Sequence, residues 1–194
     1  MSEFLQQRQK LAKPKCWQNS HFDFYDGCMR KADFEFSNIP QAYFITFRGY
    51  GTWLHGDKRG SVDRAHNRFG SPRLMPSERR RQLNLERLKH KPVRLEERQR
   101  LLVEEAIKEI CKKRHWDLWV VNARTNHIHA VVTAPCKPEP VLTALKANAT
   151  RKLREAGCCR NDESPWAKRG SKKYLWSEQD VIEAVVYVQY EQGE

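Results

Sequence analysis

The chain has 194 residues, with 36 Lys and Arg against 24 Asp and Glu, so its formal net charge is +12. A chain of this length can bury the core of one domain and carry added segments. No run of residues comes near the roughly eighteen apolar positions that a membrane span needs, and the first residues have no apolar stretch typical of a signal peptide. The composition therefore argues against a membrane protein and against a secreted one.

The positive charge is concentrated between Lys58 and Arg114, where 18 residues are basic and 8 are acidic. An excess of this kind is typical of proteins that bind polyanions. Nucleic acid is the commonest such partner, although an acidic protein or an anionic membrane surface would also suit it. The six cysteines form no CxxC pair, which indicates reduced thiols in a cytoplasmic protein. The motifs GxxxxGK(S/T) and GxGxxG are absent, so we expect no nucleotide cofactor.

The first part of the chain, residues 1–40, mixes charged and aromatic side chains without a clear period. We treat it as an N-terminal extension to a domain over residues 41–194. That domain opens with a predicted strand from Tyr43 to Arg48, which is rich in aromatic and β-branched residues. A glycine-punctuated loop follows and carries Trp53, which has two open roles: plugging an edge of the core or stacking on an unpaired base.

Residues 55–95 form a basic stretch after this loop, and glycine and proline break any regular element between Lys58 and Pro76. Three arginines along it are candidates for contact with DNA phosphates: Arg64, Arg68 and Arg73. A solvated insertion without such a role is the alternative. Ser77 is the expected N-cap of a short helix in the second half of the insertion.

A helix and two paired strands are expected in the middle of the chain. The helix runs from Leu95 to Arg114, with this apolar stripe: Leu101, Leu102, Ala106 and Ile110. A strand over residues 116–123 then leads through residues 124–126 into the strand that contains His127. The short connection predicts that these two strands form a hairpin.

A second long helix is predicted from Pro138 to Ala156, with Gly157 as its stop. Its core-facing positions should be Val141, Leu142, Leu145, Ala149 and Leu153. Much of the rest of this helix is basic, and Lys146 and Arg151 are candidates for contact with DNA.

Two histidines stand two residues apart in Asn-His-Ile-His, inside a run that otherwise reads as a buried strand. Because residues i and i+2 of a strand point to the same face, His127 and His129 should project side by side while Ile128 enters the core. Two neutral imidazoles placed in this way would supply two ligands of a metal site that still needs an oxygen ligand. The alternative is a pair of histidines satisfied by hydrogen bonds on a half-exposed strand.

Residues 176–192 are predicted to form a helix, although their valines would also suit a strand. Ser177 followed by Asp180 is typical of a helix start. One stripe is expected to face the core: Ile182, Val186 and Tyr190, with Val185 beside them. A second stripe at the same spacing is polar: Glu183, Tyr187 and Glu191. That second stripe would place a phenol and a carboxylate one turn apart, and an ordinary amphipathic helix with an exposed tyrosine is the alternative.

The Asn-His-Ile-His strand, followed about sixty residues later by a helix with Tyr187 and Glu191, resembles the HUH single-tyrosine transposases. That family includes insertion-sequence enzymes and the repeat-associated tyrosine transposases. The resemblance extends to the strand that begins at Tyr43 and to the segment 173–176 ahead of the last helix. It covers roughly residues 42–192.

The resemblance implies that His127 and His129 bind a divalent metal, Mg²⁺ or Mn²⁺, and that Tyr187 attacks a DNA phosphate. It also implies a third metal ligand four residues after the tyrosine. Glu191 stands at that position, where an amide is common in the family, so the neighbouring Gln192 is the other candidate. The expected products are a 5′-phosphotyrosine and a free 3′-hydroxyl, and rejoining needs no ATP because the covalent intermediate stores the bond energy.

The resemblance and the order of the predicted elements both imply a ferredoxin-like α+β sandwich. It would have a central antiparallel sheet with helices on one face, the basic insertion after the first strand, and the N-terminal extension. The expected partner is single-stranded or hairpin DNA, and relatives act as monomers or homodimers. Arg48 in the first strand and Trp53 after it are further candidates for contact with that DNA.

Two functions from other classes stay open. A non-catalytic nucleic-acid-binding module, derived from such an enzyme, would keep the basic surface and the aromatic loop but would have no use for a metal. A relaxase or replication initiator would share the two histidines. The short chain and the lack of a helicase-like segment argue against that last alternative.

Overall fold

A computed structural model of the protein describes residues 39–61 and 74–190. At its centre is a sheet of four antiparallel strands in the order β2-β3-β1-β4. The strands are β1 (Ala42–Gly49), β2 (Asp117–Ala123), β3 (His127–Thr133) and β4 (Trp166–Leu175). The pairing of β2 with β3 confirms the predicted hairpin. The strand with the two histidines, β3, therefore lies inside the sheet, between β2 and β1.

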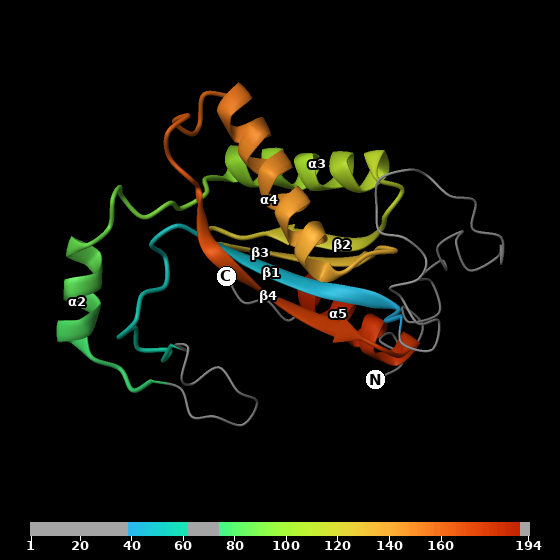
Figure 1. Ribbon diagram of the computed structural model, residues 1–194, viewed down its shortest axis with the longest axis horizontal. Coiled ribbons are helices and arrows are strands. Elements are labelled where there is room, and N and C mark those ends of the chain that lie inside the picture. The colour runs from blue at the N-terminus through green and yellow to red at the C-terminus, as the bar shows by residue number, and fades with distance from the viewer. Residues whose placement is uncertain (1–38, 62–73, 191–194) are drawn as a thin grey trace.

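Four helices accompany the sheet in the described residues: α2 (Glu78–Glu86), α3 (Glu97–Lys113), α4 (Pro138–Glu155) and α5 (Glu178–Tyr190). This part of the chain is an α+β fold. Figure 1 shows α3 and α4 on one face of the sheet and α5 on the other. The expectation that the helices pack on one face is wrong for α5. The physical reason is that β3 is buried on both of its faces, so the sheet can bury a helix on either side.

The larger core lies between the sheet and the pair formed by α3 and α4. Alternate residues of the inner strands point into it, among them Ile45 and Ile128. Helix α4 contributes the predicted inward residues, and all of them are buried: Val141, Leu142, Leu145, Ala149 and Leu153. This prediction is confirmed.

The buried stripe of α3 differs from the predicted one. It consists of Val103, Ala106, Ile107 and Cys111. Leu101, which was expected to face the core, is 58% exposed. Ala106 is buried as predicted, and Ile110 is half-buried against the core, so the prediction is wrong mainly for Leu101. Helix α3 meets both the sheet and α4, and its buried face lies one position further along the helix than the predicted stripe.

The smaller core lies between α5 and the opposite face of the sheet. It joins strand residues to one stripe of the helix: Ala42, Val131, Leu175, Val181, Ala184, Val185 and Val188. The predicted stripe is confirmed for Val185 and wrong for Tyr190, which is 61% exposed, while Ile182 and Val186 are half-buried. The helix meets the sheet through one alanine and three valines.

Both helix starts predicted at serine are confirmed. The Ser77 side chain accepts a hydrogen bond from the Arg80 backbone N–H at the start of α2 (3.3 Å). At α5, the Asp180 N–H donates to Ser177 Oγ (3.1 Å), and the Ser177 N–H donates to the Asp180 carboxylate (3.0 Å). These bonds hold the pKa of the Asp180 carboxyl below its usual range. A reciprocal cap of this kind stabilises the first turn, so the valine-rich segment is a helix.

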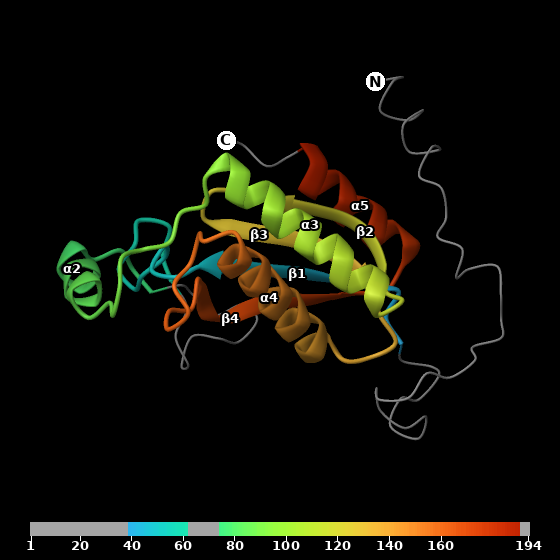
Figure 2. The same ribbon diagram turned by 90° about the horizontal axis from the view of Figure 1, so that it is seen from above.

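Helix α2 stands apart from the sheet and the other helices in Figure 2, and it buries none of its residues. The cysteines in the described part of the chain are free thiols, as predicted: Cys111, Cys136, Cys158 and Cys159. None of the helices in that part is both long and apolar enough to cross a membrane. The predicted extension over residues 1–40 lies almost wholly outside the described residues, and its boundary stays a prediction.

Gly170 of β4 lies opposite Phe47 of β1, where the sheet meets α4. A Cβ built there would stand 2.7 Å from the Thr46 carbonyl oxygen and 3.0 Å from a methyl carbon of Leu142. We expect Gly170→Ala to lower the free energy of unfolding by about 1–3 kcal/mol, because β4 would have to move away from β1 and from α4 to make room for the methyl group. Urea unfolding measures this. Ser171→Ala, at the exposed neighbouring position, is the control and should change stability by less than about 0.5 kcal/mol. Equal stabilities of the two variants would contradict the prediction.

Candidate functional site

Strand pairing gathers polar side chains on the face of the sheet that packs against α5. His129 lies directly opposite Thr46 of β1 on one side and Asn122 of β2 on the other, and His127 lies opposite Arg48. Directly opposed residues of neighbouring strands point to the same face of a sheet. We call the surface formed by these five residues the histidine face: Thr46, Arg48, Asn122, His127 and His129.

The two histidine rings lie side by side, as the alternation of strand residues predicts. Their centroids are 4.6 Å apart, and their planes are inclined at 79°. Nδ1 of His129 is hydrogen-bonded to Thr46 Oγ1 (2.8 Å), and Nδ1 of His127 donates to Oδ1 of Asn126 (2.5 Å). His129 is 7% exposed and His127 is half-buried. Each ring is therefore oriented through its Nδ1 atom.

Tyr187 reaches this face from α5. Its ring centroid is 6.0 Å from that of His129 and 5.9 Å from that of Phe44 on β1. Phe44 also contacts His129, with centroids 5.2 Å apart, so the three rings form one cluster. Tyr187 is 39% exposed. The phenol is thus held beside the histidines and can still be reached from solvent.

A side-chain hydrogen bond attaches the last part of α5 to the edge strand of the sheet. Nδ2 of Asn122 on β2 donates to the Val188 carbonyl oxygen (2.9 Å). Val188 follows Tyr187 directly and is itself buried. The bond therefore fixes the helix at the residue next to the phenol.

The donor chemistry of the histidine pair fits a divalent metal. In metal sites, a ligating imidazole commonly donates its other N–H to an oxygen, which fixes its tautomer, and Thr46 and Asn126 offer such oxygens here. Among the residues that the structure describes, no three His, Cys, Asp or Glu side chains come together in a way that would hold a metal ion. Glu191 and Gln192, the candidates for a third ligand, lie outside those residues.

The candidates for DNA contact fall into three groups. Arg64, Arg68 and Arg73 lie outside the described residues. Arg48 is part of the histidine face. Trp53 lies beside it, since Cζ of Arg48 is 3.4 Å from the centroid of the indole ring. The structure therefore brings Arg48 and Trp53 together near the histidines.

The third group, Lys146 and Arg151, lies on α4, across the sheet from the histidine face. Lys146 Nζ donates to two carbonyl oxygens of β4 (2.7 and 3.1 Å), and burial lowers the pKa of its ammonium group. Arg151 forms ion pairs with Glu109 (2.8 Å) and Glu155 (2.7 Å). Lys146 thus ties α4 to β4, and Arg151 bridges α4 and α3. The structure does not bring either residue to the histidines.

Four residues that contact the site were given no role in the sequence analysis: Phe44, Thr46, Asn122 and Asn126. Asn126 could have been identified, because it directly precedes the first histidine and its side chain is short enough to reach the neighbouring ring. Phe44 and Thr46 share a strand face with Arg48. The local pattern does not reveal which strand lies beside β3, and so it gave no signal for them.

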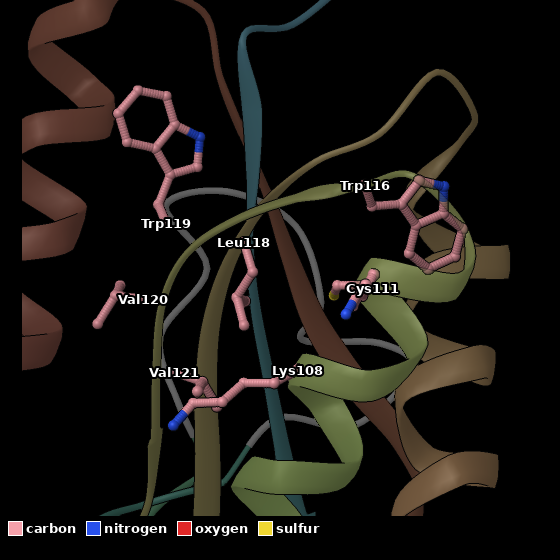
Figure 3. Close-up of a pocket in the computed structure, with 8 residues that line it drawn as sticks. Lys108, Cys111, Trp116, Leu118, Trp119, Val120 and Val121 are labelled. Carbon is pink, nitrogen blue, oxygen red and sulfur yellow. The ribbon is translucent and has the colours of Figure 1, made fainter. Parts of the chain in front are cut away.

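Two surface pockets lie away from the histidine pair. One, of about 400 Å³, lies between α3 and the edge strand β2, and Figure 3 shows Cys111 and Trp116 on one side of it and Trp119 and Val120 on the other. The other, of about 650 Å³, lies between the segment before α3 and the loop after α4. Its charged lining is mainly basic: Lys89, Lys91, Arg94, Arg160 and Glu163. Neither pocket contains a residue of the histidine face.

The profile of a family described as transposase, IS200-like, matches residues 76–187, which is more than half of the chain. None of the curated proteins matches this chain. Among solved structures, the REP-associated tyrosine transposase bound to a REP hairpin is similar, with 12% identity over 80% of this chain and 69% of the other and a TM-score of 0.44. A proposed transposase from Deinococcus radiodurans R1 is similar with 10% identity over 86% of this chain and 100% of the other, at a TM-score of 0.41.

The Asn122 contact predicts a local effect of substitution. Asn122→Leu removes the donor to Val188 while keeping a side chain of similar size, and it should lower the free energy of unfolding by about 1–2 kcal/mol. Amide hydrogen exchange should become faster in α5 and stay unchanged in α4, because only α5 loses an attachment. Gln189→Ala, at an exposed position of α5, is the control and should leave the exchange of both helices unchanged. Unaltered protection of α5 in Asn122→Leu would refute the prediction.

Proposed function

The chain belongs to the family of IS200-like transposases, and we propose that it is a metal-dependent enzyme that cuts and rejoins single-stranded DNA, with Tyr187 as its nucleophile. The observation that carries this proposal is the proximity of Tyr187 to His129, whose ring centroids are 6.0 Å apart. A phenol on one element and a pair of imidazoles on another supply a nucleophile and the start of a metal site in one place.

The order of the elements supports a ferredoxin-like sandwich as the fold. The order β-α-β-β-α-β is typical of that fold, and the elements β1, α3, β2, β3, α4 and β4 follow it here. In this assignment residues 41–194 form one domain. The basic segment 55–95, which includes α2, is an insertion between β1 and α3, and α5 is an addition that carries Tyr187.

We assign the metal to His127 and His129, with Glu191 or Gln192 as the third ligand. Each histidine would bind through Nε2, because its Nδ1 is hydrogen-bonded to a side-chain oxygen. Two nitrogen ligands suit Mn²⁺ better than Mg²⁺, although either ion tolerates the set. When bound, the ion would polarise the phosphate and offset part of its negative charge.

In the proposed reaction, Tyr187 Oη forms a bond to phosphorus while the bond from phosphorus to the 3′-oxygen breaks. The phenolic proton passes to solvent and the leaving 3′-oxygen takes up a proton, so the products are a 5′-phosphotyrosine and a 3′-hydroxyl. Rejoining reverses these steps with the 3′-hydroxyl of another strand. The phosphotyrosine bond stores the energy for joining, so no nucleotide is consumed. Contacts with Phe44 and His129 restrict the ring, and its exposure leaves room for DNA to approach.

We propose single-stranded DNA next to a hairpin as the substrate, bound by a monomer or a homodimer. The net charge of +12 supports a polyanionic partner. The basic pocket between the segment before α3 and the loop after α4 supports it further, because four of its lining residues are cationic. Arg64, Arg68 and Arg73 remain candidates for phosphate contacts. Binding through such contacts weakens as salt concentration rises.

The nucleophile can be tested by trapping the covalent intermediate. Wild-type protein, incubated with Mn²⁺ and a labelled pool of single-stranded oligonucleotides that carry random sequence beside a hairpin, should give an adduct that survives a denaturing gel. Tyr187→Phe should give none, because it lacks the phenolic oxygen that bonds to phosphorus. Tyr190→Phe is the matched control three residues further along α5, where the side chain is 61% exposed, and it should give as much adduct as wild type.

An adduct formed by Tyr187→Phe would move the nucleophile elsewhere. A wild-type protein that binds the pool but forms no adduct would instead favour the non-catalytic nucleic-acid-binding module.

The metal assignment can be tested by calorimetry with MnCl₂. The double variant His127→Ala, His129→Ala should lose Mn²⁺ binding, because it lacks both nitrogen ligands. Thr46→Val should weaken binding by about 10–100-fold, since its methyl group cannot accept the hydrogen bond that orients His129. His55→Ala is the control, because that exposed histidine is bonded to Ser61 instead. Equal affinities in wild type and the double variant would rule out the site.

A further inference from the structure

Trp53 contacts two guanidinium groups. Cζ of Arg48 lies 3.4 Å from the ring centroid, and Cζ of Arg59 lies 4.3 Å from it. Cation–π attraction holds both groups against the indole.

Asp57 holds the second of these guanidinium groups, that of Arg59, in place. Arg59 donates from Nε to Oδ1 and from Nη2 to Oδ2 of that carboxylate, both at 2.8 Å, and its backbone N–H donates to Oδ1 as well (3.0 Å). Hydrogen bonding from Arg59 holds the pKa of Asp57 well below its usual range. Trp53 Nε1 donates to the Gly60 carbonyl oxygen (2.8 Å). We call Trp53, Asp57 and Arg59 the indole clamp, and these bonds fix its geometry.

The loop that carries the clamp is tied to the strand of the histidines. Thr52 Oγ1 donates to the carbonyl oxygens of Gly49 (2.9 Å) and Asn126 (3.2 Å), and the Gly49 N–H donates to the same Asn126 oxygen (2.9 Å). Asn126 is the residue whose side chain orients His127. The clamp and the histidine pair are thus joined through a few short contacts.

Arg48 lies between the indole clamp and the histidine pair. It is opposite His127 in the strand register and two residues from Thr46, so its side chain leaves the sheet on the histidine face. Stacking on an indole uses the flat faces of a guanidinium, whereas its five N–H donors lie in its plane and point outward. A guanidinium held in this way is suited to donate two parallel hydrogen bonds to phosphate oxygens.

We propose that Arg48 donates hydrogen bonds to a non-bridging oxygen of the phosphate that Tyr187 attacks, and that Trp53, Asp57 and Arg59 are positioning residues that hold its guanidinium there. The proposal rests on the proposed function, because it names a contact within that reaction. It also gives Trp53 a different role from base stacking. The indole packs against two guanidinium groups, which compete with a base for its surface.

The test uses an oligonucleotide that wild-type protein cuts, taken from the random pool. The rate of adduct formation is measured at saturating DNA, and the dissociation constant of the same strand is measured by fluorescence anisotropy. Arg48→Gln should slow the adduct step by about 100-fold, as loss of a donor to developing charge does. Arg48→Lys should recover only part of the rate, because lysine keeps the charge but not the planar pair of donors.

Arg98→Gln is the matched control, since it removes the same charge from an exposed position on α3. The dissociation constants of Arg48→Gln and Arg98→Gln should agree within about 3-fold, because each loses one cation. A rate for Arg48→Gln equal to that of wild type would overturn the role of Arg48 while leaving the proposed function intact. Absence of an adduct from wild type would overturn both.

The clamp is tested with Asp57→Asn and Trp53→Leu. Both should slow the adduct step by about 10-fold or more with little change in the dissociation constant, because they act only by releasing Arg48. If Trp53 stacked on a base, Trp53→Leu would instead weaken binding by about 5- to 100-fold and leave the rate at saturation unchanged. Asp57→Asn keeps the size of the side chain, so the loop should keep its fold. A slower adduct step in this variant would therefore reflect a displaced Arg48 guanidinium. Wild-type rates in both variants would reject the clamp.

Discussion

The attachment of α5 to the sheet is the interaction on which the candidate site depends. The helix is held by apolar contacts of Val181, Ala184, Val185 and Val188 and by the hydrogen bond from Asn122 to the Val188 carbonyl oxygen. These contacts involve all four strands, on the face of the sheet opposite α3 and α4. Because β3 carries both the histidines and Val131, the same strand that buries the helix also presents the imidazoles to Tyr187. A helix packed on the other face would leave the phenol separated from them by the whole sheet.

The sheet separates two layers that differ in size and in polarity. The α3 and α4 side is a continuous apolar core, whereas the α5 side is apolar near one end of the strands and polar near the other. Burying polar groups is unfavourable unless they are hydrogen-bonded. His129 is 7% exposed, and its bond to Thr46 meets this requirement. The bond that stabilises the fold at this place therefore also orients the ring that would bind a metal.

Positive charge is used in two ways in this chain. On α4, Lys146 and Arg151 are engaged with β4 and with α3, so these cations stabilise the packing of the elements. Near the histidines, Arg48 lies against the indole clamp, whose own charge is balanced by the ion pair of Asp57 and Arg59. The excess of basic residues in the sequence thus does not locate a binding site by itself, because the sequence does not distinguish a cation that stabilises the fold from one at a site.

Local patterns were enough to predict β1, β2 and β3, the hairpin of β2 and β3, the inward side of α4, and the serine caps of α2 and α5. They also predicted that His127 and His129 share a face, because alternation along a strand is a property of the backbone. They failed for part of the buried stripes of α3 and α5 and for the face on which α5 packs, which follow from contacts between elements far apart in the chain. Thr46, Asn122 and the contacts of Trp53 depend on strand register and loop closure in the same way. The sequence alone determined the two imidazoles and the phenol of the site, because they stand in local patterns. The tertiary structure decided which other side chains meet them, because those contacts join distant segments.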